Sequence, residues 1–123
     1  MVGLYFSAHW CPPCRGFTPK LADAYKELIG LGKSFEIVFL SSDKSEDAFK
    51  EYFNEMPWVA LPFTKRDLKT KLTYKYECPG MPYLVLLDGK TGETITKNGR
   101  SAIAFGPSAF PFTEADIEKS KKE

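Results

Sequence analysis

Apolar residues recur along the chain with two different periods, and the two periods alternate. Nearly unbroken apolar runs of strand-forming residues occupy positions 3–8, 35–40 and 83–87. Between these runs, apolar residues return every three or four positions, which is the period of a helix that buries one face. The alternation predicts one α/β unit, with a central mostly parallel or mixed sheet flanked by helices. The run at 35–40 predicts a central strand, because both of its faces are apolar.

The first two helices follow directly from this spacing. An apolar stripe predicts a helix from about residue 12 to residue 30, where glycines stop it. A second stripe covers residues 48–56. Asp43, followed three residues later by Glu46, resembles a capping box and predicts the start of this second helix.

The last third of the chain predicts shorter elements. Leu68, Leu72 and Tyr76 lie four residues apart and indicate a short third helix. After the strand at 83–87, a turn at 88–92 and a strand at 93–96 predict a β-hairpin. Residues 100–112 match no element, and Thr113 with Asp116 predicts the cap of a last helix.

Composition and charge narrow the classes of function. A chain of 123 residues with 43% hydrophobic and 15% aromatic residues has enough apolar material for one core, and we expect a single domain over residues 1–123. Its net charge of +1 supplies no field that would attract nucleic acid or an anionic membrane. No apolar run approaches the length of about 18 residues that a membrane span needs. We expect neither nucleic acid nor a membrane as a partner.

The strongest chemical signal is the segment Trp10–Arg15, which reads WCPPCR and lies where the first strand meets the first helix. A helix N-terminus favours a thiolate, and two intervening residues keep the sulfurs of Cys11 and Cys14 close enough to form a disulfide. The motif therefore predicts dithiol–disulfide exchange. No glycine-rich fingerprint for a nicotinamide or flavin is present, so we expect no bound organic cofactor.

A second marker is Gly80-Met81-Pro82, directly before the strand at 83–87. Proline cannot donate a ladder hydrogen bond and therefore belongs at a strand start, and the bond before proline has an appreciable cis population. We predict a cis Met81–Pro82 bond.

The order of elements resembles the core of the thioredoxin fold, and several segments are similar to the nucleoredoxin and tryparedoxin branch of that superfamily. The first strand begins at about residue 2, so we expect the chain to lack the N-terminal edge strand, either as a shortened domain or as a fragment of a longer protein. The similarity covers most of the chain up to about Gly99, through residues 5–15, 35–41, 49–53, 55–58 and 80–88.

The resemblance implies a mechanism and a substrate surface. Cys11, the exposed cysteine, attacks a substrate disulfide, and Cys14 resolves the mixed disulfide to release the reduced substrate. In thioredoxin-fold proteins the proline at the position of Pro82 lies against the cysteine pair, and the residue before it, here Met81, pairs with the substrate backbone. Pro12 and Pro13 stiffen the turn between the cysteines.

Four neighbours of the motif have both a functional and a structural interpretation. Trp10 is expected to contact partners, with a partly buried aromatic as the structural alternative. Trp58 is expected to line the substrate surface, with a side chain that covers the core as the alternative. Arg15 attracts anionic substrate groups or is only a solvated helix residue. His9 invites a role as general base, but its position does not ensure that the ring faces the sulfur. Many thioredoxins carry a buried aspartate where this chain has Tyr5, which puts a carboxylate proton relay in doubt.

The third cysteine, Cys78, lies four residues before Pro82. It is interpreted as a spare buried thiol, with regulatory oxidation as the alternative. Together with Cys11, Cys14 and His9 it supplies zinc-type ligands, but structural zinc sites usually use paired knuckles, and we expect no metal.

We therefore expect a protein-disulfide reductase that takes electrons from an external dithiol donor, either a reductase or a low-molecular-weight thiol. Expected substrates are protein disulfides, with peroxiredoxins or signalling proteins as partners. The alternative is a redox-sensitive binding module that holds signalling partners through the active-site face. With three cysteines and no signal-peptide pattern in residues 1–15, we expect a cytoplasmic protein, with the nucleus as the second location.

Overall fold

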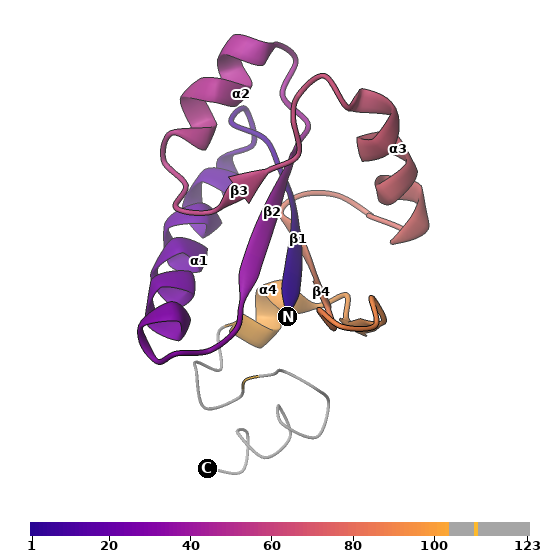
Figure 1. Ribbon diagram of the computed structural model, residues 1–123. Coiled ribbons are helices and arrows are strands. Elements are labelled where there is room, and N and C mark those ends of the chain that lie inside the picture. The colour runs from indigo at the N-terminus through magenta and orange to yellow at the C-terminus, as the bar shows by residue number, and fades with distance from the viewer. Residues whose placement is uncertain (104–109, 111–123) are drawn as a thin grey trace.

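The computed structural model describes residues 1–103 and residue 110, and in them a five-stranded mixed sheet forms the centre of the molecule (Figure 1). The strand order is β3-β2-β1-β4-β5. The strands are β1 (Val2–Ser7), β2 (Glu36–Ser41), β3 (Val59–Ala60), β4 (Tyr83–Leu87) and β5 (Thr94–Thr96).

The two central pairings differ in direction. β1 lies parallel to β2, with Tyr5 opposite Phe39, and antiparallel to β4, with Tyr5 opposite Leu84. Because side chains alternate along a strand, Tyr5 faces one side of the sheet while Leu4 and Phe6 face the other. The predicted mixed α/β sheet is confirmed.

Helices cover both faces unequally. The helices are α1 (Pro12–Gly30), α2 (Glu46–Phe53), α3 (Arg66–Lys75) and α4 (Gly99–Ile103). Side chains of α1, α2 and α4 join a large core on the Tyr5 face, and α3 contributes to a smaller cluster on the opposite face (Figure 1). No helix of the described residues is long and apolar enough to cross a membrane.

Aromatic rings dominate the core on the Tyr5 face. Phe39 stacks on Phe49 with ring centroids 5.8 Å apart and meets Tyr52 edge-on at 5.4 Å. Burying each such side chain contributes about 1.5–3 kcal/mol. The polar hydroxyls described below are therefore enclosed by a rigid apolar frame.

The start of α2 corrects one prediction. Its N-cap is Ser45, whose hydroxyl accepts a hydrogen bond from the N–H of Ala48 at 3.2 Å. Asp43 lies upstream of the helix and its carboxylate turns back to the Ser41 hydroxyl instead, so the predicted capping box of Asp43 and Glu46 is wrong. Ser45 has the shorter side chain and stands directly before the first helical residue, which is where a cap must be.

Two short elements were not predicted. β3 pairs with the outer side of β2 at Val38 and Phe39, so that this edge is partly covered. α4 begins at Gly99, where an added Cβ would lie 2.7 Å from the carbonyl oxygen of Leu84. Both are too short to leave a periodic pattern. The last helix predicted from Thr113 lies outside the described residues.

Candidate functional site

The cysteine pair lies where β1 passes into α1. Cys11 is the N-cap of the helix with an extended backbone, and its N–H donates to the carbonyl of Ala8 at 3.2 Å. Pro12 occupies the first helical position, where its missing N–H removes no intrahelical bond. The sequence therefore presents both sulfurs at the N-terminal end of a 19-residue helix.

Cys11 is less accessible than predicted. Only 7% of the residue is exposed, because Ala8, Cys14 and Met81 pack against it. Its Sγ lies 3.9 Å from the carbonyl oxygen of Met81, and the Met81–Pro82 peptide bond is cis, as predicted. The expectation of an exposed nucleophile is wrong for the free protein, in which the loop before β4 covers the sulfur.

Cys14 is completely buried, and burial raises the pKa of its thiol to about 11. Interaction with Cys11 contributes to this rise in the pKa, while the Ser7 side chain and the Ala8 backbone oppose it. The Cys14 sulfur is therefore a neutral thiol at physiological pH.

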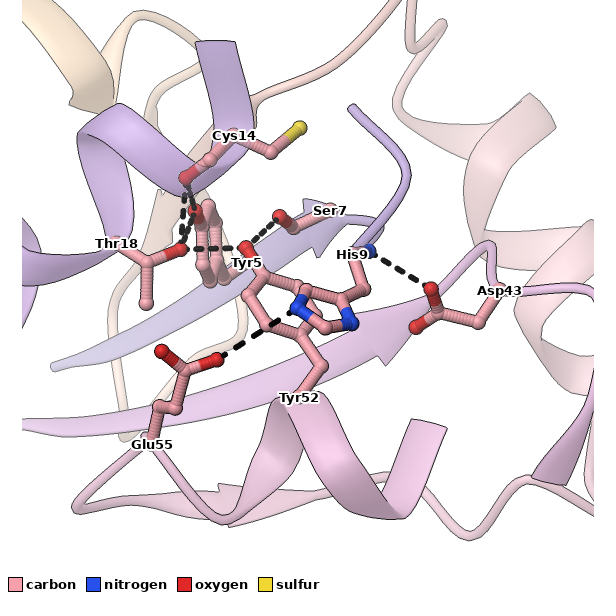
Figure 2. Close-up of polar contacts among 8 residues, drawn as sticks. All are labelled: Tyr5, Ser7, His9, Cys14, Thr18, Asp43, Tyr52 and Glu55. Atoms are coloured by element: carbon pink, nitrogen blue, oxygen red, sulfur yellow. Dashed lines mark hydrogen bonds and ion pairs between the residues drawn. The ribbon is translucent and has the colours of Figure 1, made fainter. Parts of the chain in front are cut away.

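Four buried hydroxyl groups form a continuous network beside Cys14, shown in Figure 2. The Ser7 and Tyr52 hydroxyls lie 2.7 Å apart, Tyr52 and Thr18 lie 2.5 Å apart, and Thr18 and Tyr5 lie 2.6 Å apart. The Thr18 hydroxyl also donates to the carbonyl oxygen of Cys14 at 2.9 Å. We call Tyr5, Ser7, Thr18 and Tyr52 the hydroxyl network.

His9 is held by three contacts on the same side of the site. Its backbone N–H donates to the Asp43 carboxylate at 2.7 Å, its ring stacks on Tyr52, and its Nε2 lies 3.9 Å from a Glu55 carboxylate oxygen (Figure 2). Tyr52 and Glu55 therefore fix the orientation of the ring. None of these three contacts is a hydrogen bond between the ring and the sulfur of Cys11 or Cys14.

A cavity of about 290 Å³ opens next to the hydroxyl network. Thr18 and Tyr52 line it together with His9 and Glu55. Arg15, which follows the second cysteine, lies on its rim as an exposed side chain. The cavity connects part of the buried network with the surroundings.

The predicted substrate-facing residues divide into three groups. Trp10 is 54% exposed and its indole N–H donates to the Ser42 carbonyl, while Pro12 and Pro13 are exposed beside it. Pro82 is buried, and Met81 is half-buried against the cysteine pair. Trp58 forms the third group, because it lies in the core.

Trp58 is only 4% exposed and packs edge-on against Tyr5 and Tyr25 in the core. The prediction that it lines the substrate surface is therefore wrong. It follows the apolar stripe of α2 and β3 begins immediately after it, so the chain enters the core at this point.

Cys78 is half-buried, its Sγ lies 3.2 Å from the carbonyl oxygen of Gly80, and burial raises its pKa. Among residues 1–103 and 110, no three His, Cys, Asp or Glu side chains are arranged to hold a metal ion.

Sequence reasoning missed the hydroxyl network. Tyr52 had been assigned to the apolar stripe of α2, and it is 45 residues from Ser7. The available signal was the presence of Ser7 and Thr18 at positions that the strand and helix periods direct toward the core.

Comparisons with known proteins agree with the fold and the motif. A family model described as Thioredoxin-like matches residues 1–94, and the chain belongs to this family. Probable nucleoredoxin 1 of Arabidopsis thaliana is 46% identical over 117 residues, which cover 94% of this chain and 20% of the relative. Human nucleoredoxin is 50% identical over 99 residues, which cover 80% of this chain and 22% of the relative. The chain thus spans about a fifth of the length of these nucleoredoxins.

A shorter relative and a solved structure match over more of their own length. Tryparedoxin of Trypanosoma brucei brucei is 41% identical over 90% of this chain and 76% of the relative. The structure of a tryparedoxin II in complex with glutathionylspermidine has a TM-score of 0.85 at 41% identity, covering 92% of this chain and 79% of that one. The predicted resemblance is confirmed, and these relatives are thioredoxin-type oxidoreductases with thiol–disulfide redox function.

Proposed function

We propose that this chain reduces protein disulfides, with Cys11 as the nucleophile and Cys14 as the resolving thiol. The observation that carries the proposal is the difference between the two sulfurs. Cys11 keeps 7% of its surface exposed at the N-terminal end of α1, where the Met81 carbonyl beside the cis Met81–Pro82 bond covers its sulfur, whereas Cys14 is completely buried as a neutral thiol. The first attack needs an approachable sulfur, and the second needs one that reacts only after Cys11 has formed a mixed disulfide.

The proposed substrate surface surrounds Cys11. Trp10, Pro12 and Pro13 offer exposed, stiff contact area, and Arg15 adds a positive charge. Docking of a substrate strand along Met81, with Pro82 behind it, is proposed to displace the loop from the Cys11 sulfur. This step removes the cover seen in the free protein.

The proposed source of electrons is an external dithiol donor, and no bound cofactor takes part. A tryparedoxin relative is known in complex with glutathionylspermidine, which supports a low-molecular-weight thiol as donor. A reductase protein is the other donor class. We propose protein disulfides as substrates, peroxiredoxins or signalling proteins as partners, and the cytoplasm, with the nucleus second, as the location.

A second candidate is a redox-sensitive binding module. The exposed indole of Trp10 beside two exposed prolines favours it, because aromatic side chains at a surface commonly anchor protein partners. In that case partners bind the dithiol form and leave on oxidation, without turnover.

Reduction of insulin disulfides with dithiothreitol separates these candidates. We expect Cys11→Ser to reduce the rate to the reagent background, a loss of at least about 10³-fold, because the nucleophile is gone. Cys14→Ser is expected to stop turnover and to accumulate mixed disulfides through Cys11. Cys78→Ser is the matched control and should retain the wild-type rate.

Turnover at background level in the folded wild type, with free thiols, would reject the reductase and favour the binding module. Equal activity in wild type and Cys11→Ser would reject the assignment of the nucleophile.

A further inference from the structure

The net charge of +1 conceals an uneven distribution of charge along the chain. Residues 65–75, which hold α3 and its N-cap, contain five lysine or arginine residues and one aspartate, a net charge of +4. The rest of the chain carries twelve basic and fifteen acidic residues, a net charge of −3. At an ionic strength of about 0.1 M, such a concentration of charge attracts acidic groups over a distance of about 10 Å.

The lysines of this segment have no internal counter-ion. Lys65, Lys71 and Lys75 are exposed, and Lys69 is half-buried. None of these four lysines takes part in an ion pair within residues 1–103 and 110. We call these four lysines the basic patch. A carboxylate on another molecule can therefore approach the patch without displacing a carboxylate of this chain.

The start of α3 is fixed beside the segment that leads to Cys11. Arg66 is half-buried, and its Nη1 donates to the Ser41 carbonyl at 2.8 Å. The next carbonyl along the chain, that of Ser42, accepts the indole N–H of Trp10 at 3.0 Å. Trp10 directly precedes Cys11. Arg66 therefore anchors the basic helix next to the proposed nucleophile and is not counted in the basic patch.

The end of α3 leads to the loop that covers Cys11. The N–H of Cys78 donates to the Thr73 carbonyl at 3.0 Å, which holds the chain against the last turn of the helix. Three residues later, the Met81 carbonyl oxygen lies 3.9 Å from the Cys11 Sγ. Met81 is six residues beyond Lys75, a span of at most about 20 Å. Acidic residues within about six positions of a substrate cysteine can therefore reach the basic patch.

The helix on the other side of the Cys11 segment carries the opposite charge. Residues 46–55, which include α2, hold four carboxylates and one lysine, and Glu55 lies 3.9 Å from the His9 ring. α2 and α3 lie toward the same end of the sheet (Figure 1). A long polyanion such as nucleic acid would meet the carboxylates of α2, whereas a short acidic peptide fits on α3 alone.

Two exposed apolar side chains on α3 also favour a protein as the partner. Tyr74 is 79% exposed and Leu68 is 43% exposed. Aromatic residues are enriched at protein–protein interfaces, where they add apolar contact area to charged contacts.

We propose that α3 binds a short acidic segment that flanks the disulfide of the protein substrate. This inference deepens the proposed function, on which it rests for the identity of the partner as a disulfide substrate. The binding is electrostatic and changes no covalent bond. Because α2 repels the segment that α3 attracts, the two helices orient the substrate strand in one direction along Met81.

Fluorescence anisotropy of labelled, cysteine-free peptides measures the docking without catalysis. The acidic peptide carries glutamates, and its control carries glutamines at the same positions. We expect the acidic peptide to bind on the order of tenfold more tightly at low salt, from several weak surface ion pairs acting together. The difference should disappear in about 1 M salt, where the Debye length is about 3 Å.

The key variant is the triple substitution Lys69→Gln, Lys71→Gln and Lys75→Gln, because glutamine has a helix propensity close to that of lysine. We expect it to bind both peptides equally weakly. The matched control makes the same change in net charge at three exposed lysines outside α3, and it should keep the preference for the acidic peptide. Its substitutions are Lys20→Gln, Lys33→Gln and Lys90→Gln.

Turnover of the same peptide sequences, prepared as disulfides, links the docking to the reaction. The triple variant of α3 should raise the KM for the acidic disulfide on the order of tenfold and leave kcat unchanged, because the lost contact is remote from the reacting sulfurs. The glutamine-flanked disulfide should react alike with this variant and with the wild type.

Equal affinity of the wild type for the two peptides, or an equal loss in the control variant, would overturn the docking surface. Tighter binding of single-stranded DNA of the same charge would overturn the acidic protein segment as the occupant. Binding that depends on the basic patch, together with reduction of neither disulfide, would reject the proposed reductase and leave the docking surface supported.

Discussion

The two faces of the sheet are built differently. On the Tyr5 face, α1 and α2 bury side chains completely, including Leu21, Leu28 and Tyr52. On the opposite face, α3 has no fully buried residue and begins without a side-chain cap. The hydroxyl network and Cys14 both lie on the Tyr5 face. The face that holds the reacting group in place is therefore the one with the dense aromatic core.

This difference has a physical reason. A buried thiol and four buried hydroxyls stabilise a structure only when every polar group keeps its partner, which requires fixed positions. Interlocked rings such as Phe39, Phe49 and Tyr52 provide that rigidity. Within residues 1–103 and 110, the α3 face carries no such network and tolerates looser packing.

The largest expected effect is a difference in stability loss between two substitutions, one on each face of the sheet. Leu21→Ala in α1 removes a side chain that is fully buried and should lower the free energy of unfolding by about 2–5 kcal/mol. Leu72→Ala in α3 removes a half-buried one and should cost about 1 kcal/mol. Urea denaturation measures both, and equal losses would contradict the contrast between the faces.

A smaller effect is expected from alkaline pH. The Cys14 thiol is neutral in the folded state up to a pKa of about 11, whereas in the unfolded chain it ionises near 9. The unfolded state therefore loses its proton first, and stability should fall as pH rises from about 9 to 11, by about 1–2 kcal/mol. Burial also raises the pKa of Tyr52, which acts in the same direction.

Denaturation curves at pH 8, 9, 10 and 11 measure this dependence. Cys14→Ala should reduce the dependence of the free energy of unfolding on pH. Cys78→Ala, which removes a half-buried thiol on the other face, should reduce it less. The same slope in Cys14→Ala and wild type would show that Cys14 ionises freely in the folded state.

The smallest effect concerns the helix starts. Ser45→Ala removes the hydroxyl that accepts the Ala48 N–H and should destabilise the protein by about 1 kcal/mol, while Ser45→Asp should retain most of the stability. Lys65→Ala at the uncapped start of α3 should change stability by less than about 0.5 kcal/mol. Thermal unfolding compares the three variants, and a loss at Lys65 as large as at Ser45 would be unexpected.

Features that depend on local sequence were predictable. The helix behind Cys11 and the cis bond at Pro82 follow from capping, proline and spacing rules that act over a few residues. The strands at 2–7 and 36–41 differ from the predicted runs by one residue at each end.

Features that depend on distant contacts were not predictable. Ser7, Thr18 and Tyr52 come from three elements, and nothing in their own neighbourhoods indicates that their hydroxyls meet. Trp58 was expected to line the substrate surface, but it is only 4% exposed, because the chain turns inward there. How deeply a side chain is buried depends on how other segments pack around it. The periodicity of a segment indicates only which of its faces is buried.

The two tryptophans give the molecule an optical property that follows from their opposite surroundings. Trp10 stands beside Cys11 with most of its indole in solvent, whereas Trp58 is enclosed between Tyr5 and Tyr25. Iodide should quench the fluorescence of Trp10 and leave that of Trp58 nearly unchanged. The emission therefore contains a signal specific to the surroundings of Cys11, with an internal reference that monitors the folded core.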